Sequence, residues 1–98
     1  MASIKVIARI SVKAGGEEQV KSVLSNLVKP TRKESGCISY ELLHNSQEPT
    51  EFVLLEEWST QIALDGHTEA SHTKNAEAKV ADWLVQVPPD VRTYQTVA

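Results

Sequence analysis

Apolar and polar residues alternate along the first part of the chain. Between positions 4 and 12 every second residue is apolar, in the set Ile4, Val6, Ala8, Ile10 and Val12. This period of two predicts a β-strand with one face toward a core. From Glu17 the apolar spacing becomes helical, with a stripe made of Val20, Val23, Leu24, Leu27, Val28 and Thr31. Pro30 predicts a kink or break near residues 26–29, and Gly36 predicts a left-handed cap that ends the helix.

Two further strands and a second helical region follow. Residues 37–44 and 51–58 have strand character and flank a polar loop, which predicts a hairpin. A helical region then begins near Thr60 in two pieces, the first weakened by Gly66, and Pro88-Pro89 stops it. Residues 91–97 are rich in β-branched residues and predict a last strand. The order β-α-β-β-α-β predicts an α+β, ferredoxin-like sandwich, a single domain over residues 1–98 with a four-stranded antiparallel sheet and helices on one face.

The predicted sheet has apolar residues on both faces. If the alternation holds, the side away from the helices carries Ile7, Leu43, Val53 and Leu55. A small domain is stabilised when such a face is covered, and an apolar patch of this kind is typical of an interface. We therefore expect a homodimer in which two sheets meet face to face and form a closed α+β barrel.

The hairpin sets the register of the other sheet face. It predicts the pairs Tyr40–Glu56 and Leu42–Leu54, with Ile38 near Trp58. The helix-covered face then holds Ile38, Tyr40, Leu42, His44, Phe52, Leu54, Glu56 and Trp58. Glu56 is the anomaly, because a carboxylate on an apolar face must be paired, hydrogen-bonded or protonated. Two interpretations stay open: a structural hydrogen bond to a helix N-terminus or a tyrosine hydroxyl, or a proton-handling group in a cavity.

The histidines and the cysteine suggest no standard metal or nucleophile site. His67 and His72 are five residues apart, which is not the i, i+4 spacing of a helical zinc pair, and no third ligand lies near them in sequence. Gly15-Gly16 also lacks the fingerprint of a nucleotide-binding loop, so we expect neither a metal nor an organic cofactor. His72 belongs to the apolar stripe and is interpreted as a hydrogen-bonded core residue, whereas His67 follows the break at Gly66 and is expected at a pocket mouth. Cys37 is interpreted as a packing residue.

Composition narrows the function classes further. The 98 residues include ten Lys and Arg against thirteen Asp and Glu, a balance that argues against nucleic-acid binding. One cysteine excludes an internal disulfide. The longest apolar run, residues 52–55, is far too short for a membrane span, and Lys5 and Arg9 interrupt any signal-peptide core. We expect a soluble cytoplasmic protein without a membrane or nucleic-acid partner.

A combined motif resembles a known family. Glu56-Glu57-Trp58, Leu64, His67 and His72 form the pattern E-x-W-x5-L-x-x-H-x4-H, preceded by Glu34-Ser35-Gly36-Cys37 and Tyr40. Over the chain from the first strand to Tyr94, this pattern resembles the antibiotic-biosynthesis-monooxygenase-like family. The resemblance implies a ferredoxin-like barrel that dimerises through its sheets. It also implies one of several activities: oxygenation of phenols or quinols without metal or flavin, isomerisation of a phosphorylated sugar, or haem degradation.

Three positions argue against the haem-degrading branch. The resemblance places tryptophan, asparagine and histidine in that branch where this chain has His67, Ala8 and Glu77. Some quinone-forming members have an asparagine at the position of Leu54, so one expected oxyanion donor is missing here, although Trp58 is retained.

Two functions from different classes follow. The first is a cofactor-free monooxygenase of a small phenol or quinol, in which Glu56 or His67 takes the phenolic proton. Trp58 would stack on the ring, Tyr40 would hydrogen-bond an oxygen, His72 would orient its neighbours, and Leu54 and Phe52 would complete the substrate site. The second is a non-catalytic dimer that binds a small aromatic or apolar metabolite in the same cavity. A sugar-phosphate isomerase is a further alternative, but the pocket-facing set supplies no cation for a phosphate.

Overall fold

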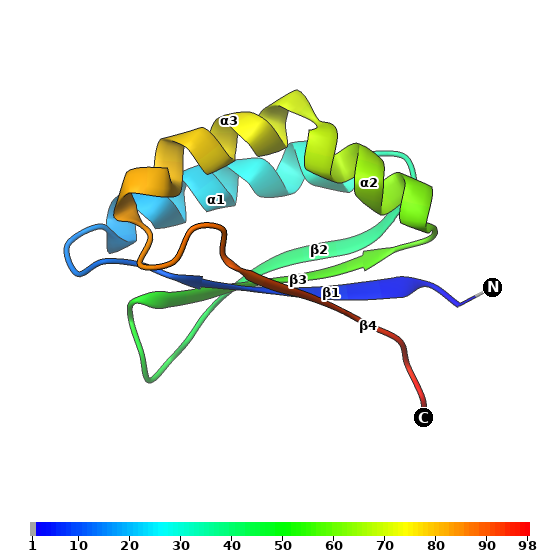
Figure 1. The fold of residues 1–98 in the computed structure, drawn as a ribbon, viewed down its shortest axis with the longest axis horizontal. Helices are drawn as coiled ribbons and strands as arrows, with labels where there is room; N and C mark the ends of the chain where they lie inside the picture. Colours follow the sequence, from blue (N-terminus) through cyan, green and yellow to red (C-terminus); the bar gives the residue numbers. More distant parts are fainter. Residues whose placement is uncertain (1) are drawn as a thin grey trace.

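The computed structural model describes residues 2–98 and has the predicted ferredoxin-like fold (Figure 1). The sheet is antiparallel, with strand order β2-β3-β1-β4, and the helices cover one of its faces. In chain order the elements are β1 (Ile4–Ser11), α1 (Glu17–Arg32), β2 (Cys37–His44), β3 (Glu51–Trp58), α2 (Gln61–Glu69), α3 (Ser71–Val80), a 3₁₀ turn (Ala81–Trp83) and β4 (Asp90–Tyr94).

Helix α1 buries the predicted stripe but does not break at Pro30. Val20, Leu24, Leu27 and Thr31 are buried, and the helix continues to Arg32. Proline removes one backbone donor and strains the preceding turn, but here it lies in the last turn, where little helix remains to be disrupted. The prediction for Gly36 was half right. Its φ is +84°, yet the helix is already capped at Lys33, and Gly36 instead turns the chain into β2, where an added Cβ would lie 2.4 Å from the Ala63 Cβ.

The hairpin has the predicted register apart from one residue. Tyr40 pairs with Glu56, Leu42 with Leu54 and His44 with Phe52. The pair Ile38–Trp58 is wrong, because the register shifts between Cys37 and Ser39 and Cys37 pairs with Trp58 instead. An irregularity of this kind leaves one residue without a partner, and Ile38 is 55% exposed. His44, at the far end of the strand, is also exposed.

The second helical region consists of two helices, and the last strand forms an edge of the sheet. Thr60 caps α2 by accepting a hydrogen bond from the Ala63 N–H, and Ala70 separates α2 from α3. β4 ends at Tyr94 rather than at Val97, because Tyr94 pairs with Lys5 and β1 begins only one residue earlier, at Ile4. The segment between the 3₁₀ turn and β4 carries Pro88 and Pro89 and runs along the edge of the helical layer (Figure 1).

The face of the sheet away from the helices stays without a cover in the single chain. Ile7, Val53 and Leu55 are half-buried there, and Leu43 is exposed. The same face carries an ion pair between Arg9 and Glu51, at 2.6 Å. Within residues 2–98, no helix combines the length and the apolar character needed to cross a membrane.

Candidate functional site

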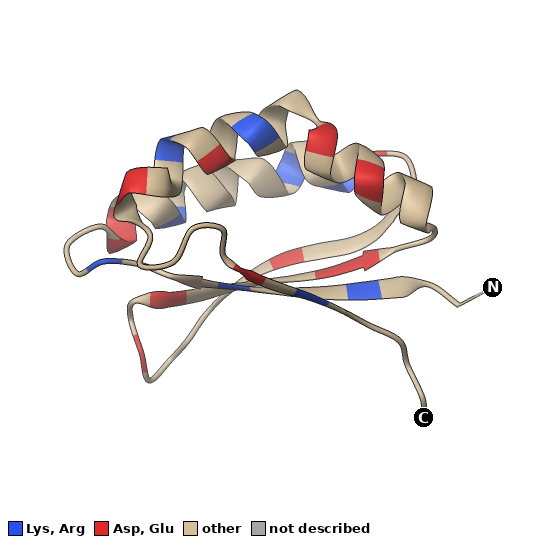
Figure 2. Ribbon diagram, viewed as in Figure 1, with Lys and Arg blue, Asp and Glu red and all other residues tan. Residues whose placement is uncertain are grey.

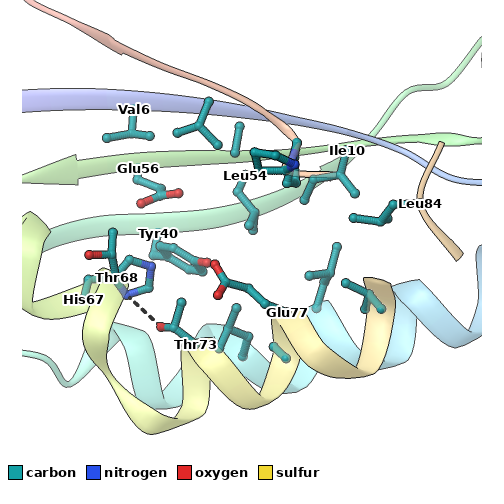
Figure 3. Close-up of a pocket in the computed structure, with 18 of the residues that line it drawn as sticks. Val6, Ile10, Tyr40, Leu54, Glu56, His67, Thr68, Thr73, Glu77 and Leu84 are labelled. Atoms are coloured by element: carbon teal, nitrogen blue, oxygen red, sulfur yellow. Dashed lines mark hydrogen bonds between the residues drawn. The ribbon is translucent and has the colours of Figure 1, made fainter. Parts of the chain in front are cut away.

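A cavity of about 340 Å³ lies between the sheet and the helical layer. Its wall is mostly aliphatic. The lining residues come from all four strands, from the three helices and from the segment before β4, whereas the end of the hairpin near its loop does not contribute. Figure 3 shows most of the polar lining residues near one end, below β3 and beside α2, with Glu77 farther along α3. A small, largely apolar cavity with a few convergent polar groups is the usual form of a small-molecule site.

Three buried side chains form what we call the polar end: Tyr40 from β2, Glu56 from β3 and His67 from α2. Tyr40 is 1% exposed, and Glu56 and His67 are each 5% exposed. The rings of Tyr40 and His67 meet edge to face, with centroids 5.5 Å apart. The antiparallel register places Tyr40 opposite Glu56, and α2 brings His67 over both.

His67 is held from behind by a carboxylate that the sequence analysis did not assign. The Nδ1 atom of His67 lies 2.8 Å from the Glu34 Oε2, in the loop between α1 and β2. The same oxygen lies 2.6 Å from the Nε2 of His72. A carboxylate can only accept hydrogen bonds, so each imidazole presents an N–H to Glu34. His67 therefore carries its ring proton on Nδ1 when it is neutral, and its Nε2 has a free lone pair.

The free nitrogen of His67 faces the cavity. Among residues 2–98, Glu34 and Thr73 supply the hydrogen-bond contacts of His67, and both lie at Nδ1. Figure 3 shows the bond to Thr73 on one side of the ring and Glu56 and Tyr40 on the other. The Nε2 atom thus points toward the polar end, where a ligand would be. The arrangement has the parts of a general base: an imidazole open to a ligand and oriented by a carboxylate.

Glu56 has a structural partner and a free oxygen. The indole N–H of Trp58 donates a hydrogen bond to Glu56 Oε1 at 2.9 Å. The sequence analysis expected a structural hydrogen bond from a helix N-terminus or a tyrosine hydroxyl, and the donor is a tryptophan instead. Burial raises the pKa of Glu56, and this effect exceeds the opposing influence of the Trp58 hydrogen bond and of His67. Burial, with the nearby charge of Glu56, also raises the pKa of Tyr40, which keeps its hydroxyl as a donor.

The predicted site residues separate into two groups. Leu54, Tyr40, Glu56 and His67 line the cavity, whereas Trp58, Phe52 and His72 do not. Trp58 is fully buried behind His67, with ring centroids 4.7 Å apart, and Phe52 stacks on His44 at the outer end of the hairpin. His72 lies on the far side of Glu34, half-buried, and borders a second, shallower groove between α1 and α3.

The sequence analysis expected His67 at the mouth of the cavity, and this prediction was wrong. The mouth is marked by the lining residues that are exposed to solvent, namely Thr68, Glu77, Val87, Pro88 and Val91. These residues belong to α2, α3, β4 and the segment before β4, so the cavity opens between the helical layer and the edge strand. His67 is buried in the wall instead, because it belongs to the last turn of α2 and faces the sheet.

Glu34 also changes the argument about metals. The expectation of no metal relied on the absence of a third ligand, and the fold supplies one: donor atoms of Glu34, His67 and His72 all lie within 4.8 Å of one another. The contacts of 2.8 and 2.6 Å to the Glu34 oxygen are hydrogen-bond distances. Donor atoms that each lie about 2.0–2.2 Å from a zinc ion in tetrahedral geometry are farther apart than this. The cluster is therefore described as a hydrogen-bonded triad.

No spacing rule could have found Glu34. It is 33 residues from His67 and 38 from His72 along the chain, and only the packing of the α1–β2 loop against α2 and α3 joins them. Its one sequence signal was its place in the Glu34-Ser35-Gly36-Cys37 motif. Gly36 makes the close approach possible, because a side chain there would collide with Ala63 of α2.

Comparison with known proteins gives a consistent result. The family model described as antibiotic biosynthesis monooxygenase matches residues 3–79. A chain of Mycobacterium tuberculosis named "Putative monooxygenase Rv0793" is 35% identical over 83 residues, which span 85% of this chain and 81% of that one. A Bacillus subtilis chain named "Putative monooxygenase YcnE" is 34% identical over 84 residues, which span 86% of this chain and 87% of that one.

Solved structures agree over nearly the whole fold. The structure of Rv0793 has a TM-score of 0.90 at 31% identity and covers 99% of this chain and 97% of its own. A Nitrosomonas europaea protein described as a "Putative antibiotic biosynthesis monooxygenase" has a TM-score of 0.92 at 26% identity, and covers 98% of this chain and 91% of its own.

Proposed function

The chain belongs to the antibiotic biosynthesis monooxygenase family, and from that premise we propose that it is a cofactor-independent monooxygenase of a small phenol or quinol. The observation that carries the proposal is the orientation of His67. Its Nδ1 is bound to Glu34 at 2.8 Å, and its Nε2 is open to a buried cavity. An enzyme whose substrate itself reduces dioxygen needs a base, a dry cavity and stabilisation of an anion, and the polar end offers each of these.

The first step is proton transfer. A phenolic O–H in the cavity donates to the Nε2 of His67, which takes the proton and becomes an imidazolium ion. The Glu34 carboxylate stabilises that positive charge through Nδ1–H and holds the ring in place. General base catalysis of this kind contributes about 10²–10⁴-fold to a rate. Both bases that the sequence left open have a free acceptor atom and an orienting partner, but only the partner of His67 is a carboxylate, which stabilises the base once it has taken the proton.

The remaining steps balance without an external reductant. The phenolate ring carbon forms a bond to dioxygen and gives a peroxide, which takes the proton from the His67 imidazolium. The O–O bond then breaks, one oxygen stays on the carbon as a carbonyl, and the other leaves as water with the hydrogen from that carbon. The substrate loses two hydrogens and gains one oxygen atom, a four-electron oxidation that matches the four-electron reduction of dioxygen, so a phenol and dioxygen give a quinone and water.

Tyr40 and Glu56 have supporting roles in this scheme. Tyr40 keeps its proton because burial raises its pKa, so its hydroxyl can donate to the phenolate or peroxide oxygen. Glu56 is fixed by Trp58 through one oxygen, and the other oxygen faces the site. Burial raises the pKa of Glu56, so this oxygen holds a proton more readily than an exposed carboxylate does and can pass one to or from the reacting oxygens.

The cavity wall favours an aromatic substrate over a sugar phosphate. Leu54 and the neighbouring aliphatic residues leave little for a sugar's hydroxyl groups to bond with, and none of the lining residues is Lys or Arg. A phosphate group without a cationic partner is costly to bury. The volume of about 340 Å³ lies at the lower end of the range of ligand sites, which suits one or two fused rings.

We also propose that the protein is a homodimer built on the open sheet face with Ile7, Leu43, Val53 and Leu55. A domain of this size gains stability by covering an apolar face. The double substitution Val53→Asp and Leu55→Asp places charges in the centre of that face and should give a monomer or an unfolded chain in analytical ultracentrifugation. A wild-type chain that sediments as a stable monomer at micromolar concentration would contradict the dimer.

The experiment that tests the function is oxygen consumption by chelator-treated protein with a panel of phenols and quinols. We expect uptake that depends on both protein and substrate, with one quinone formed per dioxygen consumed. A matched reaction with His67→Ala protein measures the background oxidation of each substrate. If no member of the panel is consumed but several bind in the cavity, the non-catalytic binding function replaces the enzymatic one.

A further inference from the structure

We infer that the cavity takes ligands that are uncharged when they enter and rejects anions, and that Glu77 at the mouth sets this preference. This inference deepens the proposed function, on which it rests for the aromatic nature of the ligand, by adding the charge of the substrate class. It follows from the charged groups around the mouth rather than from the chemistry at the polar end.

The lining residues contain two carboxylates and no permanent cation. Glu56 lies at the polar end and Glu77 at the mouth, where Figure 3 shows its side chain directed into the cavity from α3. Glu77 is solvent-exposed, and none of the salt bridges among residues 2–98 includes it. A ligand that enters therefore passes an uncompensated negative charge.

None of the cations on the elements that form the mouth lines the cavity. On α3, Lys74 pairs with Glu69 at 3.4 Å, and Lys79 borders the groove on the other side of the helix. On β4, Arg92 pairs with Asp90 at 3.0 Å. Figure 2 shows acidic residues on α2 and both acidic and basic residues along α3. A mouth lined by one sign of charge repels ligands of the same sign before they bind.

The reaction is compatible with this barrier because the substrate becomes an anion only inside. A neutral phenol passes Glu77 without repulsion, and its proton moves to His67 within the cavity. The phenolate and the imidazolium then form together as a pair, so the site never holds an unpaired anion. A substrate that carries a carboxylate, sulfonate or phosphate would bring a second negative charge that no lining residue neutralises.

The test is calorimetric binding of two probes of nearly equal size, naphthalene-1-sulfonamide and naphthalene-1-sulfonate. We expect the neutral sulfonamide to bind at least about tenfold more tightly, which is the effect of one like charge about 12 Å away at an effective dielectric constant near 20. In Glu77→Lys protein the ratio of the two dissociation constants should fall at least about fivefold. Raising the salt concentration should bring the two dissociation constants of the wild type closer together, because salt screens the charge at the mouth.

The matched control is Asp82→Lys. Asp82 is exposed on the 3₁₀ turn next to α3 and does not line the cavity, so the substitution changes the net charge equally without changing the mouth. In Asp82→Lys protein the ratio of the two dissociation constants should equal that of the wild type. Equal binding of both probes to the wild type, an Asp82→Lys effect as large as that of Glu77→Lys, or no binding of either probe would each overturn the inference.

These outcomes are separable from those of the proposed function. Charge-selective binding without oxygen uptake from any phenol would leave the inference standing and remove the enzymatic function. Oxygen uptake of equal efficiency from a neutral phenol and from its sulfonated analogue would support the enzymatic function and overturn the inference about charge.

Discussion

The polar end of the cavity and its mouth are built in different ways. The polar end consists of Tyr40, Glu56 and His67, all at least 95% buried, on regular strands and a helix. Two of these three side chains are fixed by a hydrogen-bonded partner, His67 by Glu34 and Glu56 by Trp58. The mouth, by contrast, is exposed, and three of its five residues belong to the segment around Pro88 and the short edge strand β4.

The contrast separates two tasks. Chemistry needs side chains held to within a fraction of an ångström, which buried groups with hydrogen-bonded partners provide. Selection among ligands needs only shape and charge at the entrance, which exposed residues on a loop and an edge strand can provide and vary. Substitutions at the polar end should therefore change turnover, and substitutions at the mouth should change which ligand enters.

The largest effect is expected from the loss of His67. His67→Ala removes the base and should lower turnover about 10²-fold or more, provided that proton abstraction limits the rate. Steady-state oxygen uptake checks this, with circular dichroism to confirm folding. His44→Ala is the control, because His44 is an exposed histidine at the other end of the sheet face and does not line the cavity. Full activity in folded His67→Ala protein would place the chemistry elsewhere.

Glu34→Gln should have the next largest effect, although Glu34 does not line the cavity. A glutamine amide can donate to the Nδ1 of His67, which would move the ring proton to Nε2 and block the lone pair that faces the ligand. It also removes the charge that stabilises the imidazolium. We expect a loss in kcat of about 10–100-fold with little change in KM. Glu18→Gln, an exposed carboxylate on α1, is the control, and equal kinetics in the two variants would remove Glu34 from the mechanism.

Glu56→Gln tests the effect of burial on Glu56 through the free energy of unfolding rather than through the reaction rate. Because burial raises the pKa of Glu56 in the folded chain, the folded state keeps a proton that the unfolded state loses as pH rises above about 4.5. The free energy of unfolding therefore falls with increasing pH between the unfolded and the folded pKa. Glutamine does not titrate and can still accept from Trp58. The variant should thus gain stability relative to the wild type between pH 4 and pH 7.

Urea denaturation at the two pH values measures this difference. Glu18→Gln again serves as the control, since an exposed carboxylate should produce no comparable divergence. Parallel curves for wild type and Glu56→Gln would show that Glu56 is better solvated than its position suggests.

The smallest effect is expected at the mouth. Val91→Ala removes two methyl groups from an exposed part of the lining, so only a little apolar contact with the ligand is lost. We expect KM to rise a few-fold and to change more than kcat, in the same oxygen-uptake assay. If Val91→Ala lowered kcat as much as Glu34→Gln does, the division between the polar end and the mouth would fail.

Local pattern was sufficient for the fold and for half of the site. Alternation along the hairpin placed Tyr40 opposite Glu56, because a strand period of two leaves one register that buries the apolar residues. The same argument failed at Ile38, since an irregularity in one strand cannot be seen in the alternation of its residues. Pro30 misled because a proline destabilises a helix without necessarily ending it, and α1 continues through it to Arg32.

The rest of the site depends on tertiary packing. Trp58 shares the covered face with Glu56, and its pattern alone could not tell a residue that lines a cavity from one that supports the lining. Glu34 joins two histidines more than thirty residues away, through a loop whose approach to α2 depends on Gly36. A sequence motif indicated that these residues belong together, and only the fold shows that they form one hydrogen-bonded set.

The protonation state of one nitrogen tests the central claim most directly. In ¹⁵N NMR spectra of labelled protein, at a pH where the ring is neutral, His67 should carry its proton on Nδ1 and leave Nε2 free. Binding of 1-naphthol should shift the Nε2 resonance toward that of a nitrogen that accepts a hydrogen bond, and Glu34→Gln should abolish the tautomer preference. A neutral His67 with its proton on Nε2 would contradict the account, because such a ring has no lone pair to offer a phenol.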